Sequence, residues 1–135
     1  MISKHISFEE ATNSPTALRF GIKNEPNEEQ LSNMKLVAEK LFEPIREKYG
    51  KPIKINSFFR CEELNKKVGG SASSQHTALN GAAIDISGGS KEENKKLFEI
   101  AKEFDYDQVI NEYDFSWVHI SYKKTGNRKQ ILVIK

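Results

Sequence analysis

The chain has 135 residues, a length typical of one domain that buries its own core. Its 21 Lys and Arg residues against 19 Asp and Glu residues give a net charge of +2, mixed along the chain, which does not favour nucleic-acid binding. The single cysteine, Cys61, excludes an internal disulfide and a multi-thiolate metal cluster. No stretch has the length of a membrane span, and the start lacks the apolar run of a signal peptide. We therefore expect one domain over residues 1–135, monomeric, cytoplasmic as synthesised and not inserted in a membrane.

The first predicted elements are two capped helices. Residues 7–10 form a capping box that opens a short helix, which ends near 13–15 and places Phe8 and Ala11 against the core. Residues 20–26 are expected to be a loop. Asn27, with Gln30 three residues later, then begins the longest helix.

Apolar residues recur at helical spacing along that longest helix, from Leu31 to Tyr49, so one face is expected to be buried. Gly50 ends it. Pro44 lies inside the pattern and lacks a backbone donor, which predicts a kink or break near Glu43.

The rest of the chain alternates short strands, helices and polar loops, which predicts an α+β fold with a small sheet and flanking helices. In the strand over 83–86, Asp85 points to one face while its apolar neighbours point to the other. The expected segments are a strand over 53–56, a helix over 62–67, a polar loop over 71–80, a strand over 83–86, a helix from Ser90 to Phe104, and strands over 107–112, 117–122 and 130–134.

The strands over 107–112 and 117–122 form a hairpin whose register follows from its loop. If residues 113–116 connect them, Glu112 faces Trp117 and Ile110 faces His119. Glu112 and His119 then lie on the same face as diagonal neighbours, about 7–8 Å apart at the backbone.

Two of the three histidines, together with one strand carboxylate, make up a candidate metal-binding set. His76, Asp85 and His119 offer two imidazoles and a carboxylate, the ligands of a catalytic zinc ion that keeps its fourth position open for water. Scattered, solvated side chains would give the same spacing, because no HExxH-type pattern connects the three residues. Spacing alone leaves both interpretations open.

At these residues the chain resembles the zinc D-Ala-D-Ala carboxypeptidase and L-alanyl-D-glutamate endopeptidase family, which cleaves peptidoglycan peptides and includes phage endolysins. The strongest likeness lies in Ser74-x-His76, Gly81-x-Ala83-x-Asp85-Ile86 and Trp117-x-His119. Further segments similar to the phage-type branch are residues 44–46, 55–60 and 64–71, so that the likeness extends from about Phe8 to Tyr122.

The resemblance implies a hedgehog/DD-peptidase-like fold in which a small antiparallel sheet holds Zn²⁺ through His76, Asp85 and His119. It also implies that Arg60 matches the arginine of a Ser-x-x-Arg element, which would bind a substrate carboxylate or stabilise the oxyanion. A surface arginine in an ordinary ion pair is the alternative for Arg60.

Of two departures from the family pattern, one concerns the path of the loop after His76 and the other concerns the catalytic base. The loop after His76 is two residues longer than usual, and Ser116 stands where several branches have the catalytic glutamate. Glu112 is the best substitute for that base, and Asp114 is the reserve candidate.

Four further residues are candidates for a functional role. Ser74 either binds substrate or caps its loop, and Trp117 is a pocket wall or a core residue. His5 is expected to be incidental, and Cys61 is expected to be a small packed residue without nucleophilic function.

The expected function is hydrolysis of peptidoglycan peptide bonds, as D,D-carboxypeptidase or L-alanyl-D-glutamate endopeptidase. The absence of a leader is typical of phage or prophage lytic enzymes, which reach the cell wall after release. The alternatives are a zinc-bearing module that binds peptidoglycan without turnover and a phage accessory protein without metal.

Overall fold

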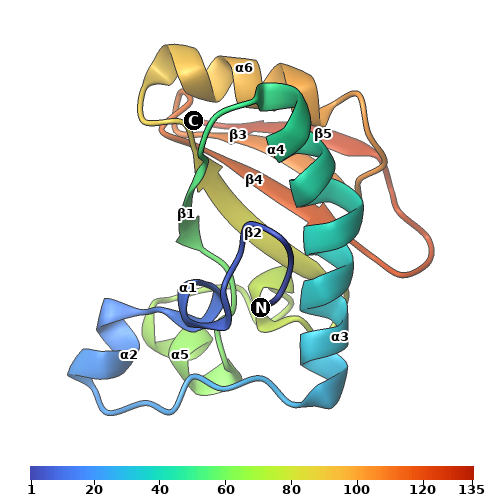
Figure 1. Cartoon of the computed structure of the whole chain (residues 1–135). Helices are drawn as coiled ribbons and strands as arrows, with labels where there is room; N and C mark the ends of the chain where they lie inside the picture. The colour runs from blue at the N-terminus through green and yellow to red at the C-terminus, as the bar shows by residue number, and fades with distance from the viewer.

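The computed structural model describes residues 1–135 as an α+β fold, in which helices pack against one five-stranded sheet (Figure 1). All neighbouring strands are antiparallel except β3 and β5, which are parallel. The strands, in their order across the sheet, are β1 (Lys54–Ser57), β2 (Ala82–Ser87), β4 (Trp117–Tyr122), β3 (Gln108–Glu112) and β5 (Gln130–Ile134). The α+β class and the antiparallel sheet are thus confirmed, with one parallel pair at β5.

The parallel pairing of β5 depends on the buried carboxylate of Asp107, at the start of β3. Arg128 donates to it from its backbone N–H (2.9 Å), from Nε (3.0 Å) and from Nη2 (2.6 Å). The backbone N–H of Gln130 donates to the Asp107 carbonyl at 2.9 Å. The segment before β5 is therefore fastened beside the start of β3, and both strands run in the same direction. Strand alternation predicts that β5 exists but does not indicate which strand it pairs with or in which direction.

The longest helix is a continuous column of three parts: α3 (Glu28–Val37), a π-helical turn (Ala38–Phe42) and α4 (Glu43–Tyr49). The expected break at Pro44 takes the form of this π turn, in which the Glu43 N–H donates to the Ala38 carbonyl. Gly50 ends the helix in the left-handed conformation, with φ 76°.

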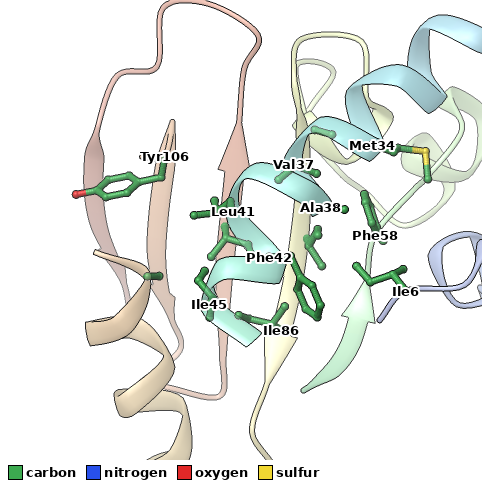
Figure 2. Packing of buried hydrophobic residues seen from close by; sticks show 14 of the residues in the cluster. Ile6, Met34, Val37, Ala38, Leu41, Phe42, Ile45, Phe58, Ile86 and Tyr106 are labelled. Atoms are coloured by element: carbon green, nitrogen blue, oxygen red, sulfur yellow. The ribbon is translucent and has the colours of Figure 1, made fainter. Parts of the chain in front are cut away.

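The core lies between this helix and the sheet. Figure 2 shows side chains of the helix gathered with Ile86 of β2. Met34, Val37, Leu41 and Ile45 are fully buried there. They meet the apolar face of the sheet, formed by Ile84, Ile86, Val109, Val118 and Ile120. Asp85 of β2 and His119 of β4, which alternate with these apolar residues, consequently lie on the opposite face.

Three short helices gather at one end of the molecule (Figure 1): α1 (Phe8–Thr12), α2 (Pro15–Arg19) and α5 (Glu62–Lys67). The capping box at Ser7 is present, and Ala11 is buried, but Phe8 is 38% exposed and does not anchor the helix as expected. Helix α2 was not predicted, because its apolar residue Leu18 faces solvent and gives no amphipathic pattern. Its signal was the Ser14 cap followed by Pro15 at the first helical position.

Helix α6 (Lys91–Ala101) begins at the predicted Ser90 cap and ends three residues before Phe104. The backbone N–H groups of Glu103 and Phe104 each donate to a carbonyl three residues earlier, in tight turns that close the helix. None of the helices combines the length and the apolarity needed to cross a membrane.

The β3–β4 loop contains three consecutive left-handed residues, Tyr113, Asp114 and Phe115, with φ of 49°, 55° and 60°. Such backbone is strained for residues with side chains and must be held by its surroundings. The buried amide of Asn94 on α6 holds it, because its Nδ2 donates to the Phe115 carbonyl at 2.8 Å and the Ser116 carbonyl at 3.2 Å. Its Oδ1 accepts from the Gly88 N–H at 2.7 Å.

We expect Asn94→Ala to lower the free energy of unfolding by about 2–3 kcal/mol, because it leaves buried backbone groups without partners. Urea unfolding followed by circular dichroism measures this change. Lys95→Ala is the matched control on the exposed side of α6, with an expected change of less than about 0.5 kcal/mol. Equal stability of both variants would mean that Asn94 does not hold the loop.

Candidate metal centre

His76 lies on a short 3₁₀ helix (Gln75–Thr77) within the segment that was expected to be an irregular loop. Ser74 caps this turn by accepting from the His76 N–H at 3.3 Å. The His76 carbonyl in turn accepts from the Arg60 N–H at 2.9 Å. The long helix adds a further contact, since Gln30 Nε2 donates to the Thr77 carbonyl at 2.9 Å. His76 is thus held on three sides and is only 3% exposed.

The two additional residues of this loop complete the turn. Ala78 adopts the left-handed conformation, with φ 59°, and its carbonyl accepts from Asn33 Nδ2 at 2.9 Å. Gln75 Nε2 donates to the Asn80 carbonyl at 2.9 Å. The longer loop therefore closes on itself and leaves His76 in place.

The imidazole of His76 has a defined tautomer. Its Nδ1 lies 2.8 Å from the Phe58 carbonyl, which can only accept, so Nδ1 carries the proton. The other ring nitrogen, Nε2, points to Asp85 and lies 3.2 Å from Oδ2. A carbonyl that fixes the far nitrogen in this way commonly orients a histidine that binds a metal through its other nitrogen.

Asp85 and His119 face each other on adjacent strands. They are direct partners in the β2–β4 register, and His119 Nδ1 lies 3.0 Å from Asp85 Oδ1. Burial alone would raise the pKa of Asp85, but the charge of His76 and the hydrogen bonds from both histidines outweigh it, so the pKa is lowered. Asp85 therefore stays ionised, as a metal ligand must be.

The three side chains fit a divalent ion. Each offers one ligand atom, and these atoms all lie within 4.8 Å of one another. A tetrahedral zinc ion with bonds of about 2.0–2.2 Å requires about 3.3–3.6 Å between ligand atoms, which small side-chain movements would provide. The rings of His76 and His119 meet edge to face at 5.2 Å between centroids, so the two imidazoles approach from different directions. The structure thus brings together the three residues that the sequence singled out.

Glu112 lies on the same face of the sheet as His119. The predicted hairpin register is confirmed, with Glu112 opposite Trp117 and Ile110 opposite His119. Burial, followed by the charge of Asp85, raises the pKa of Glu112, while the two histidines and Arg60 oppose that rise. A carboxylate with a raised pKa is a stronger base, which suits proton transfer near neutral pH.

Arg60 also belongs to this cluster of charges. Burial lowers the pKa of its guanidinium, and the charges of Asp85 and Glu112 act in the opposite direction. Its Nε is buried without a hydrogen-bond partner, and its Nη2 donates to Ser74 Oγ at 3.4 Å. Arg60 forms no ion pair at salt-bridge distance, which leaves donors free for a ligand.

The reserve base and the usual base position are both engaged elsewhere. Asp114 is 76% exposed and pairs with Lys91 Nζ at 2.6 Å, a hydrogen bond that lowers the pKa of its carboxyl. Ser116 Oγ donates to the Tyr113 carbonyl at 2.7 Å. Of the acidic candidates, only Glu112 has its charge coupled to the three donors.

The remaining candidates have structural contacts. His5 pairs through Nδ1 with Glu43 Oε1 at 2.6 Å and is not part of the donor cluster. Cys61 caps α5 and packs beside the core. Trp117 is half-buried, tilts against Tyr113 at 5.2 Å between ring centroids, and has a buried Nε1 without a partner. Substrate binding by Trp117 and Ser74 stays a prediction.

Sequence reasoning did not identify the residues that hold His76. The Phe58 carbonyl is a backbone group and carries no sequence signal. The spacing of Asn27 and Gln30 indicates only a capping box, which they form, whereas Gln30 Nε2 also donates to the Thr77 carbonyl. Both contacts join segments distant in sequence.

A comparison with known families agrees with this geometry. A family model described as Peptidase M15 matches residues 4–121. A search of the curated proteins gives no significant match. The matched region contains His76, Asp85 and His119 as well as Arg60 and Glu112. The chain therefore belongs to the peptidase M15 family and is a metallopeptidase by descent.

Proposed function

We propose that the chain is a zinc-dependent peptidase that hydrolyses peptide bonds of peptidoglycan, as D,D-carboxypeptidase or L-alanyl-D-glutamate endopeptidase. The observation that carries the proposal is the cluster of His76 Nε2, Asp85 and His119 Nδ1 in a chain of the peptidase M15 family, with the His76 tautomer fixed by Phe58. The proposed site of action is the cell wall, reached after release from the cell in which the protein is made.

The proposed roles of the protein groups follow from their positions. Zinc bound by the three donors would supply a water of lowered pKa and polarise the scissile carbonyl. Glu112 takes the proton of the attacking water on its carboxylate and returns it to the leaving amine. Arg60 donates its free N–H groups to the developing oxyanion or to a substrate carboxylate.

Digestion of defined muropeptides tests this function. Zinc-loaded protein is expected to shorten them, and mass spectrometry of the products identifies the cleaved bond. Loss of a terminal D-Ala indicates the carboxypeptidase, and separation of L-Ala from D-Glu indicates the endopeptidase. A chelator should stop the reaction, and added Zn²⁺ should restore it. Full activity in the chelated protein would rule out a metal-dependent mechanism.

A second candidate is a zinc-bearing module that binds peptidoglycan without turnover. Ser116 favours it, because this residue stands at the usual base position and its hydroxyl is bonded to the Tyr113 carbonyl. If the zinc-loaded protein binds muropeptides and leaves their masses unchanged, this second candidate replaces the first.

A further inference from the structure

A polar cleft of about 340 Å³ lies beside His119 on the open face of the sheet. One wall is the loop that carries His76, and the floor is formed by β3 and β4. The lining residues are Ser71, Ser73, Ser74, Gln75, Asn80, Gln108, Ile110, His119, Lys123 and Arg128. The cleft therefore begins at a proposed zinc ligand and ends at two cationic side chains.

The charge of this cleft is uneven. None of its lining residues is acidic. The guanidinium of Arg128 is largely compensated by the buried carboxylate of Asp107, with which it makes two hydrogen bonds. Lys123 makes no ion pair with any carboxylate of the chain. The Lys123 ammonium thus gives the far end of the cleft an uncompensated positive charge.

Lys123 is also held in position. Asn127 clamps its backbone, because Asn127 Oδ1 accepts from the Lys123 N–H at 2.8 Å and Asn127 Nδ2 donates to the Lys123 carbonyl at 3.2 Å. Gly81 packs against its stem, and a Cβ at Gly81 would lie 3.0 Å from Lys123 Cγ and 2.4 Å from the Tyr122 carbonyl oxygen. Gly81 has φ 75°, which favours glycine there as well. The cation is thus presented from a constrained backbone.

The position of Lys123 relative to His119 sets the size of the ligand. Lys123 follows His119 by four residues along the direction of β4, which corresponds to about 13 Å at about 3.3 Å per residue. Glu112 pairs with Trp117, on the other side of His119 along the same strand. An extended peptide of roughly four residues would span from His119 to Lys123.

We propose that this cleft is a substrate subsite that selects an anionic group, with Lys123 as its carboxylate-binding residue and Arg128 as a supporting donor. This inference rests on the proposed peptidase function and adds to it the requirement for a carboxylate a few residues from the scissile bond. The serine and amide side chains of the cleft then supply hydrogen bonds to the peptide backbone of the substrate.

Two stem peptides that differ in one group test the subsite. The first is L-Ala-γ-D-Glu-L-Lys-D-Ala-D-Ala, acetylated at the N-terminus and with a free C-terminal carboxylate, so that either proposed bond can be cleaved. The second carries a carboxamide in place of the α-carboxylate of D-Glu. Their dissociation constants are measured by NMR titration of the zinc-loaded protein, and mass spectra are taken before and after. Where a peptide is cleaved, the ratio of kcat/KM values replaces the ratio of dissociation constants.

We expect wild-type protein to prefer the carboxylate peptide by about fivefold, as for one partly exposed ion pair. Lys123→Met should lose this preference, and Lys123→Arg should restore it. Lys124→Met, at the exposed neighbouring residue, should keep it. The preference should also weaken in 1 M salt, because added ions screen the pair.

Equal binding of the two peptides to wild-type protein, or an unchanged preference in Lys123→Met, would overturn the subsite. Failure of the proposed function has a different signature. In that case both peptides keep their masses with every variant, while the binding ratio still decides whether Lys123 selects the carboxylate.

Discussion

The His76→Ala protein is expected to lose its zinc and its hydrolytic activity together. His76 supplies one of three protein donors, and its ring is oriented by the Phe58 carbonyl, so a methyl group can replace neither function. Loss of a partner that only orients a ligand already lowers metal affinity by about 10–100-fold, and loss of the ligand itself should exceed this. Elemental analysis of the purified protein should fall from one zinc per chain to a small fraction.

His5→Ala is the matched control for this experiment. The chain has three histidines, and His5 is the one that pairs with Glu43 of α4 instead of joining the donor cluster. We expect this variant to keep stoichiometric zinc and full activity. Circular dichroism of both variants separates metal loss from unfolding. Stoichiometric zinc in folded His76→Ala protein would show that the three donors are not the metal site.

Local patterns predicted the parts of the fold that depend on neighbouring residues. The capping boxes at Ser7 and Asn27 and the glycine at position 50 set helix boundaries within a few residues. The loop length between Glu112 and Trp117 was enough to predict the hairpin register and to place Glu112 on the face of His119.

Features that depend on distant contacts were not predictable in this way. The direction of β5 depends on Arg128 reaching a buried carboxylate 21 positions earlier. The ordered turn around His76 depends on Gln30, 47 positions earlier, and on the Phe58 carbonyl, 18 positions earlier. Periodicity and capping report only the nearest few residues, so such contacts leave no pattern.

The candidate site also combines residues that local patterns place with one that they do not. Strand alternation placed Asp85 and His119 on the face opposite the core, and the β2–β4 pairing makes them direct partners. Spacing alone could not bring His76 to them, since it lies outside any strand. The family resemblance supplied that link, and the structure adds the geometry that makes it chemically reasonable, with Nε2 of His76 3.2 Å from Asp85.

Replacement of the proposed base should separate catalysis from metal binding. Glu112→Gln keeps the size and shape of the side chain but cannot accept a proton, so kcat should fall by about 10²–10⁴-fold while zinc content stays unchanged. Steady-state hydrolysis of the muropeptide that wild-type protein cleaves measures the change. Asp114→Asn is the matched control in the adjoining loop, where Lys91 lowers the pKa of the native carboxyl and makes it a weak base.

We expect Asp114→Asn to keep kcat within about twofold, because its side chain is exposed and its pairing with Lys91 contributes little. A large loss in Asp114→Asn with normal rates in Glu112→Gln would exchange the two assignments. Comparable losses in both would indicate a change in the β3–β4 loop, since its left-handed residues follow Glu112 directly. Because Glu112 directly precedes the strained loop, the position of the base depends on the register of this hairpin. The two substitutions test that dependence without changing any of the three proposed metal ligands.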